Sequence, residues 1–163
     1  MIFPFNAGEV FKIALQLEDN GGRFYEAAAA KPFPTEIKVL FKHLAAEERG
    51  HKSVFTQLLK KVPPAATAAT VWDPDNDLDK YLKMMADRHV FSQAPAELDH
   101  RIDGLTDYPE AVKMAMSFEK DTIVFFLELL EAAESYAESR DQIKKLVDEE
   151  RKHLRRLTKL LEK

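Results

Sequence analysis

Two copies of the pattern Glu-x-x-His stand in distant parts of the chain, Glu48 with His51 and Glu150 with His153. Residues three apart share one face of an α-helix, so each pair can present a carboxylate oxygen and an imidazole nitrogen to one metal ion. One such pattern is weak evidence, because surface helices are rich in both residue types. Its recurrence indicates a duplicated metal-binding unit.

Each copy follows a further glutamate that interrupts an apolar helix stripe. Glu18 precedes Glu48 by 30 residues, and Glu119 precedes Glu150 by 31. An unpaired carboxylate in a protein core costs several kcal/mol, so each must meet positive charge there. We therefore predict that six side chains converge inside the protein: Glu18, Glu48, His51, Glu119, Glu150 and His153.

The first two helices must bring Glu18 and Glu48 to the same height. They are expected over residues 6–30 and 35–62, and prolines end each of them. The short connection makes the helices antiparallel, and the two glutamates stand about equally far from the corner. Residues 6–62 are therefore predicted to form one helical hairpin.

A second hairpin of the same kind is predicted over residues 107–162. Asp107 and Glu110 can form a capping box at its start, and its second helix is capped by Ser135 or Ser139. The remaining two glutamates of the set again lie on either side of the corner, so they too are expected to meet at one height.

Residues 63–106 connect the two hairpins. The segment is rich in turn-forming residues, with one amphipathic helix expected over 78–91. A connection this long suits a crossover that returns along the roughly 40 Å of a long helix, so that the third helix runs parallel to the second. The predicted fold is a single all-α domain over residues 1–163, a four-helix bundle with a long crossover between helices two and three.

Composition excludes several functional classes. The net charge of -4, without a long basic run, argues against binding to nucleic acid or to an anionic membrane surface. The longest apolar run is residues 123–127, and the N-terminus lacks the positive leader of a signal peptide, so a soluble cytoplasmic protein is expected. The chain has no cysteine, which excludes disulfides, thiolate metal sites and a nucleophilic thiol.

The predicted cluster therefore needs a metal that carboxylates and imidazoles can hold. Four carboxylates would repel one another in a low-dielectric core, and two divalent cations would neutralise them. A set of mostly oxygen ligands with one imidazole per ion suits iron or manganese, and zinc would bind without offering redox chemistry. We expect two iron ions, with manganese or zinc as other occupants.

At these residues the chain resembles the ferritin-like di-iron carboxylate proteins of the rubrerythrin type. Such bundles take one Glu from each of two helices and Glu-x-x-His from each of the others. The resemblance covers all four long helices and implies that the six residues are the metal ligands, with Glu48 and Glu150 as bridges. It further implies a non-haem di-iron oxidoreductase, a homodimer, that acts on hydrogen peroxide or dioxygen with an external electron donor and no catalytic residue beyond the ligands.

The sequence departs from rubrerythrins in two respects. It lacks the cysteines of their rubredoxin domain, and it has Thr122 where they carry an additional Glu one turn after the ligand of the third helix. Two alternatives to a redox enzyme therefore remain open. One is a non-catalytic metal-binding or iron-sensing bundle, and the other is an iron carrier that takes up many more ions.

Several neighbours of the predicted cluster have expected roles of their own. Gly21 and Gly22 each cost about 1 kcal/mol in a helix relative to Ala, which indicates either a close approach of another helix or a kink. Tyr25 is expected in the core, hydrogen-bonded to a ligand carboxylate. Glu47 and Glu149 are expected to be solvated, or to reach the histidine four residues later on their own helix.

Overall fold

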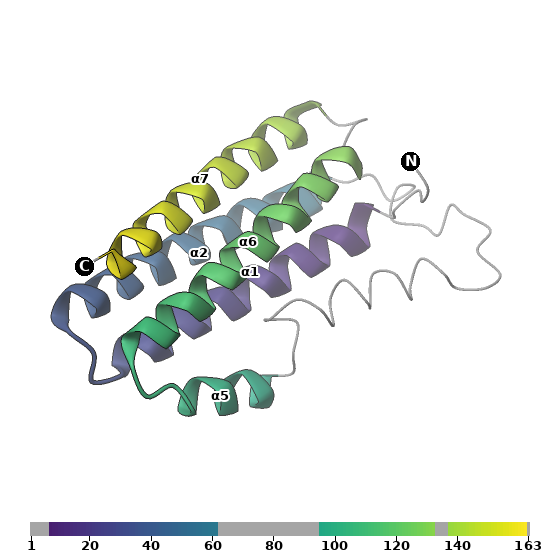
Figure 1. The fold of residues 1–163 in the computed structure, drawn as a ribbon. Coiled ribbons are helices and arrows are strands. Elements are labelled where there is room, and N and C mark those ends of the chain that lie inside the picture. The colour runs from purple at the N-terminus through teal and green to yellow at the C-terminus, as the bar shows by residue number, and fades with distance from the viewer. Residues whose placement is uncertain (1–6, 62–94, 133–136, 163) are drawn as a thin grey trace.

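The computed structural model describes residues 7–61, 95–132 and 137–162 of the chain. Within these residues the protein is helical, without a strand (Figure 1). Four long helices and one short helix are present: α1 (Ala7–Ala30), α2 (Thr35–Lys61), α5 (Pro95–Asp103), α6 (Tyr108–Ala132) and α7 (Ala137–Leu161). The all-α prediction is confirmed.

The long helices form a four-helix bundle. Helices α1 and α2 make one antiparallel hairpin and α6 and α7 make the other, while α1 also packs on α6 and α2 on α7. Figure 1 shows that α2 and α6 start at the same end of the bundle and run in the same direction. This parallel arrangement is the one that a long crossover was predicted to produce. The helix expected over residues 78–91 lies outside the described residues.

Helix α5 corrects the sequence-based reading, which left residues 95–103 in a turn-rich segment. Its two large apolar residues, Leu98 and Ile102, lie one turn apart and are both buried. Proline is favoured at the first position of a helix, where its missing N–H costs nothing. An ion pair of 3.1 Å between Arg23 Nη2 and Asp99 Oδ1 ties the helix to α1. Nine residues with two apolar positions are too few for periodicity to reveal a helix.

Of the residues predicted to cap the starts of α6 and α7, one is confirmed and one is wrong. Asp107 Oδ1 accepts a hydrogen bond of 2.9 Å from the backbone N–H of Glu110, so the cap of α6 is confirmed. Ser139 lies inside α7 and does not cap it. The other candidate, Ser135, is outside the described residues.

The apolar core is divided into two clusters, one toward each end of the bundle. Each cluster takes residues from all four long helices, among them Phe24, Phe41, Phe118 and Leu157 in the first, and Phe11, Phe55, Phe126 and Ile143 in the second. Each fully buried Phe contributes roughly 2 kcal/mol. The two clusters thereby stabilise a bundle that carries a polar layer between them.

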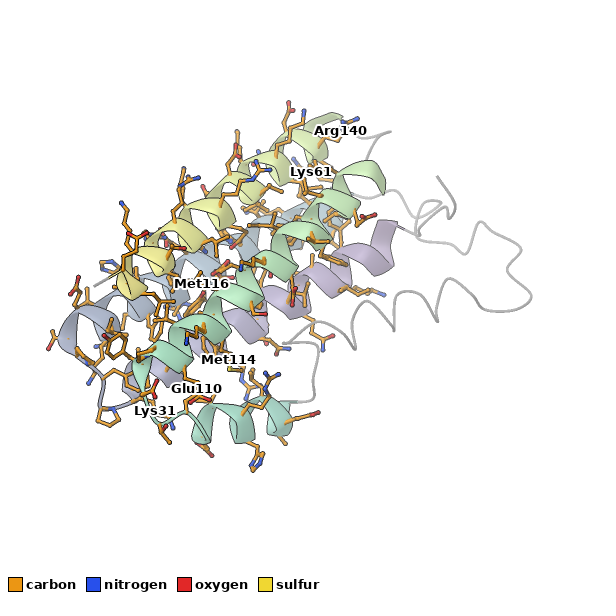
Figure 2. All side chains as sticks on the ribbon, viewed as in Figure 1. Lys31, Lys61, Glu110, Met114, Met116 and Arg140 are labelled. Atoms are coloured by element: carbon orange, nitrogen blue, oxygen red, sulfur yellow. The ribbon has the colours of Figure 1, made fainter. Side chains whose placement is uncertain are left out.

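Helix α6 is the most apolar of the long helices that line this core. Its residues Met114 and Met116 are partly buried and pack against the first cluster, in the gap-filling role expected of methionine (Figure 2). In the described part of the chain, no helix has the length and apolar character needed to span a membrane.

Candidate metal centre

The polar layer between the two apolar clusters contains all six side chains that the sequence predicted to converge. Each is at most 3% exposed. Every long helix contributes one carboxylate, and α2 and α7 each add a histidine one turn after it. The residues are Glu18 on α1, Glu48 and His51 on α2, Glu119 on α6, and Glu150 and His153 on α7.

The six residues form two overlapping groups in which one ligand atom of each residue lies within 4.8 Å of the others. Position A is formed by Glu18, Glu48, His51 and Glu150, and position B by Glu48, Glu119, Glu150 and His153. Only Glu48 and Glu150 belong to both groups. They are the two residues that could bridge a pair of ions, as the family resemblance implied.

Both histidines direct Nδ1 into the cluster. His51 Nδ1 lies 2.7 Å from Glu150 Oε1 and 3.4 Å from Glu18 Oε2. His153 Nδ1 lies 3.1 Å from Glu48 Oε1 and 3.0 Å from Glu150 Oε2. The two rings stack with centroids 5.4 Å apart and planes 10° apart. Nδ1 is therefore the atom that each imidazole could offer to a metal.

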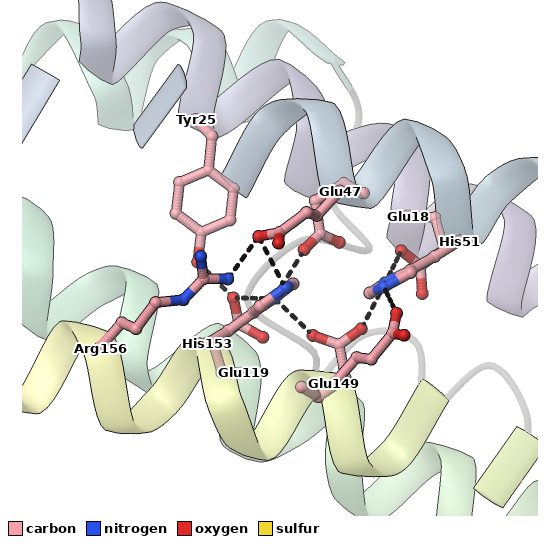
Figure 3. Close-up of polar contacts among 10 residues, drawn as sticks. Glu18, Tyr25, Glu47, His51, Glu119, Glu149, His153 and Arg156 are labelled. Atoms are coloured by element: carbon pink, nitrogen blue, oxygen red, sulfur yellow. Dashed lines mark hydrogen bonds and ion pairs between the residues drawn. The ribbon is translucent and has the colours of Figure 1, made fainter. Parts of the chain in front are cut away.

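The outer nitrogens of the two rings face carboxylates on the opposite hairpin (Figure 3). His51 Nε2 lies 2.8 Å from Glu149 Oε2, and His153 Nε2 lies 3.3 Å from Glu47 Oε2. A proton on Nε2 leaves the Nδ1 lone pair free for a metal, and such outer carboxylates orient metal-binding histidines in many proteins.

Glu47 and Glu149 are exposed, as the sequence predicted, but the alternative that each reaches the histidine on its own helix is wrong, because each meets the histidine of the opposite hairpin. With Nδ1 turned into the bundle, Nε2 of each ring points across to the neighbouring helix. The sequence carried a signal for these residues, because an acidic residue directly precedes both Glu-x-x-His patterns.

Arg156 on α7 contacts one of these outer carboxylates. Its Nη2 donates to Glu47 Oε2, the same oxygen that faces His153. Tyr25 is fully buried, and its hydroxyl donates a hydrogen bond to Glu119 Oε1. The hydrogen bond predicted for Tyr25 is therefore present.

Burial and mutual repulsion perturb the carboxyl groups strongly. Burial, followed by repulsion from Glu48, raises the pKa of Glu18 well above its usual value. Burial, followed by repulsion from Glu150, raises the pKa of Glu119 in the same way and that of Glu48 to about 7. Without metal, such groups reach neutrality by holding protons.

The pKa values of the two imidazoles are raised, whereas burial alone lowers the pKa of a histidine. Burial lowers the pKa of His51, but its contacts with Glu150 and Glu18 outweigh burial and raise that pKa to about 12. Burial likewise raises the pKa of Glu150, but contacts with His153 and His51 hold it below its usual range. Without metal, the imidazoles therefore hold protons, and their positive charge faces the buried carboxylates.

The donor atoms of the cluster fit a metal pair. The buried atoms without a hydrogen bond include both carboxylate oxygens of Glu18, Glu48 and Glu150, Oε2 of Glu119, and Nδ1 of His51 and His153. Buried polar atoms in proteins nearly always have a partner. Four carboxylates and two neutral imidazoles are balanced in charge by two divalent cations, which would also supply the missing partners.

Thr122, one turn after Glu119 on α6, is fully buried beside this layer, and its hydroxyl makes no hydrogen bond. Neither position A nor position B includes it.

Two surface cavities border the cluster. One, of about 420 Å³ between α1 and α2, is lined by Glu18 together with charged residues that include Arg49 and Lys52. The other, of about 480 Å³ between α2 and α7, is lined by both histidines. Residues of the cluster therefore border open space on two sides of the bundle.

Comparison with known proteins agrees with this geometry. The family model of rubrerythrin matches residues 9–161. A solved structure of a ferritin-like diiron-carboxylate protein from Thermotoga maritima has a TM-score of 0.70 to this chain, covers 98% of this chain and 97% of its own, and is 24% identical. This likeness establishes the ferritin-like fold. None of the curated proteins compared with the chain matches it.

Proposed function

The chain belongs to the rubrerythrin family, and from that membership and the geometry of the cluster we propose that it is a di-iron carboxylate redox protein acting on hydrogen peroxide or dioxygen. The observation that carries the proposal is the pair of overlapping groups, which share Glu48 and Glu150 and whose inward atoms lack hydrogen bonds. A purely structural polar network would satisfy those atoms internally.

Iron is the metal that we propose for both positions. The donors are mainly carboxylate oxygens with one imidazole at each position, a set that suits iron or manganese. When bound, two iron ions can deliver the two electrons that convert one hydrogen peroxide and two protons into two water molecules. Zinc would occupy the same ligands without redox activity.

The protein's own residues bind the ions and control access to them. Glu18, His51, Glu119 and His153 each serve one position, and the two shared glutamates serve both. The apolar clusters on either side exclude bulk water from the layer, and the two cavities admit a molecule as small as peroxide or dioxygen.

We further propose that electrons come from an external donor, because the chain has no cysteine and so no thiolate-bound redox centre of its own. The homodimer implied by the family resemblance also remains a proposal, which sedimentation of the purified protein can check.

The decisive experiment is a turnover assay on iron-loaded protein with an artificial reductant and either peroxide or dioxygen. We expect consumption of the oxidant over many cycles, with two electrons used per peroxide. Glu48→Gln should abolish turnover, and Glu128→Gln, at an exposed position on α6, should leave it unchanged. Two bound irons without turnover would favour the metal-binding or sensing alternative. Uptake of many more than two irons per chain would favour the carrier.

A further inference from the structure

Positions A and B share two glutamates but differ in what surrounds their histidines. His51, in position A, makes a hydrogen bond of 2.8 Å to Glu149. His153, in position B, stands 3.3 Å from Glu47, a contact that is longer and weaker. The two halves of the duplicated sequence therefore present imidazoles in different environments.

Arg156 enlarges this difference. It pairs with the oxygen of Glu47 that faces His153, so the negative charge at this oxygen is partly neutralised. Among the described residues, Glu149 makes no ion pair with a lysine or arginine, and its oxygen is left to His51 alone. A carboxylate that accepts the Nε2 proton makes the imidazole a stronger metal ligand, and a guanidinium on the same oxygen opposes that effect.

A second and independent contact also weakens the ligands of position B relative to those of position A. The Tyr25 hydroxyl donates to Glu119, the carboxylate that belongs only to position B. In position A the corresponding carboxylate is Glu18, and neither of its oxygens accepts a hydrogen bond. A donated hydrogen bond withdraws electron density from a carboxylate and weakens it as a metal ligand.

We propose that the two metal positions are inequivalent, with position A binding a divalent cation more tightly than position B, and that Glu149, Arg156 and Tyr25 set the difference. These are positioning residues, since each acts on the metal through a ligand. The inference rests on the proposed function in one respect only, that the cluster binds two divalent cations. The ion in position B is then the first to be lost as the concentration of free metal falls.

The test is a titration of metal-free protein with Co(II), in which calorimetry and the visible absorption of the bound ion measure binding. We expect two binding steps whose dissociation constants differ about tenfold or more. His153→Gln should keep the tight step and lose the weak one, and His51→Gln should lose the tight step. These two variants assign each step to its position.

The residues that set the difference are tested by single substitutions. Arg156→Gln should tighten the weak step about threefold to tenfold and narrow the gap between the steps, because Glu47 is then free to polarise His153. Tyr25→Phe should also tighten the weak step, because Glu119 then loses the hydrogen bond that weakens it as a ligand. Glu149→Gln should instead weaken the tight step about tenfold. Arg155→Gln is the matched control, since it removes the same charge from an exposed neighbouring position and should change neither step.

Several results would overturn the inference. They are two equal steps in the natural protein, loss of the tight step in His153→Gln, or the same titration curve for Arg156→Gln and Arg155→Gln. Each of these leaves two bound ions and hence the proposed di-metal site intact. Absence of Co(II) binding in folded protein would instead refute the di-metal site itself.

Discussion

Gly21 on α1 lies directly against the ring of Phe118 on α6. A Cβ atom placed on Gly21 would stand 2.5 Å from Phe118 Cζ, which is too close for a real side chain, and 3.1 Å from Glu48 Oε2, which is a tight contact. The glycine pair in the sequence therefore marks a close approach of two helices at the height of the metal cluster, which is the first of the two readings that the sequence allowed.

Gly21→Ala should consequently lower the free energy of unfolding, because forcing extra volume into a packed core costs about 1–3 kcal/mol and the gain in helix propensity offsets only about 1 kcal/mol of it. Gly22→Ala is the matched control, because its Cβ would meet Glu48 Cβ at an ordinary 3.7 Å. There the gain in helix propensity, about 1 kcal/mol, should leave the protein as stable as before or more so. Urea unfolding of both variants measures the difference, and equal effects would contradict the packing argument.

Two metal ions should bind per chain, and loss of a shared glutamate should reduce the number of bound ions more than loss of a ligand that serves one position. Glu48→Ala removes a ligand from both positions, and Glu18→Ala removes one from position A only. We expect Glu48→Ala to retain less than one ion and Glu18→Ala to retain about one, measured by elemental analysis after anaerobic Fe(II) loading and gel filtration. Glu128→Ala, on the exposed face of α6, should retain both. Two ions retained in Glu48→Ala would exclude Glu48 as a bridge.

The stability of the metal-free protein should fall as the pH rises from about 5 to 7. The pKa of Glu48 rises from about 4.5 in the unfolded chain to about 7 in the folded one, and those of Glu18 and Glu119 are also raised. A carboxyl with a raised folded pKa stabilises the fold below its unfolded pKa, and this stability is lost as the pH rises toward the folded value. For Glu48 the loss of stability approaches about 1.4 kcal/mol per pH unit between these two pKa values.

Bound metal should reverse this trend, because the ligands must release their protons before an ion binds. The difference in melting temperature between metal-loaded and chelator-treated protein should therefore widen from pH 5 to pH 7. Below about pH 4.5 the lowered pKa of Glu150 acts in the opposite sense, and stability is lost as that group takes up its proton. A metal-free protein that gains stability between pH 5 and 7 would contradict the predicted protonation of the cluster.

Much of the fold and all six clustered residues could be predicted because each polar residue interrupts an apolar stripe of period 3.6. A buried polar residue lowers the stability of the fold unless it meets the other polar residues of the set. The near-equal spacing of the two halves places all of them at one height in the bundle. The partners of Glu47 and Glu149 could not be predicted in this way. Which neighbour a half-exposed side chain meets depends on the rotation of α2 against α7, and sequence spacing within one helix carries no information on that rotation.

The interior position of Thr122 bears on the reaction with peroxide. It is fully buried one turn after Glu119, where rubrerythrins carry an additional Glu, and its hydroxyl has no hydrogen-bond partner. A carboxylate there could bind or release iron as the charge of the site changes, and a threonine hydroxyl is too short and too weak a ligand to do so. We therefore expect ordinary di-iron binding but slower oxidation by peroxide than in a rubrerythrin.

Thr122→Glu should raise the rate at which peroxide oxidises the reduced, iron-loaded protein, measured by stopped-flow absorption at equal iron content. Thr122→Gln is the matched control, because it adds nearly the same volume beside Glu119 without a carboxylate. If the added charge is what matters, only the Glu variant should react faster. Both variants should have a free energy of unfolding about 1–3 kcal/mol below that of the natural protein, since each forces a longer side chain into a filled interior. Equal rates in the two variants, or a natural protein already as fast as a rubrerythrin, would show that the residue at position 122 does not limit the reaction.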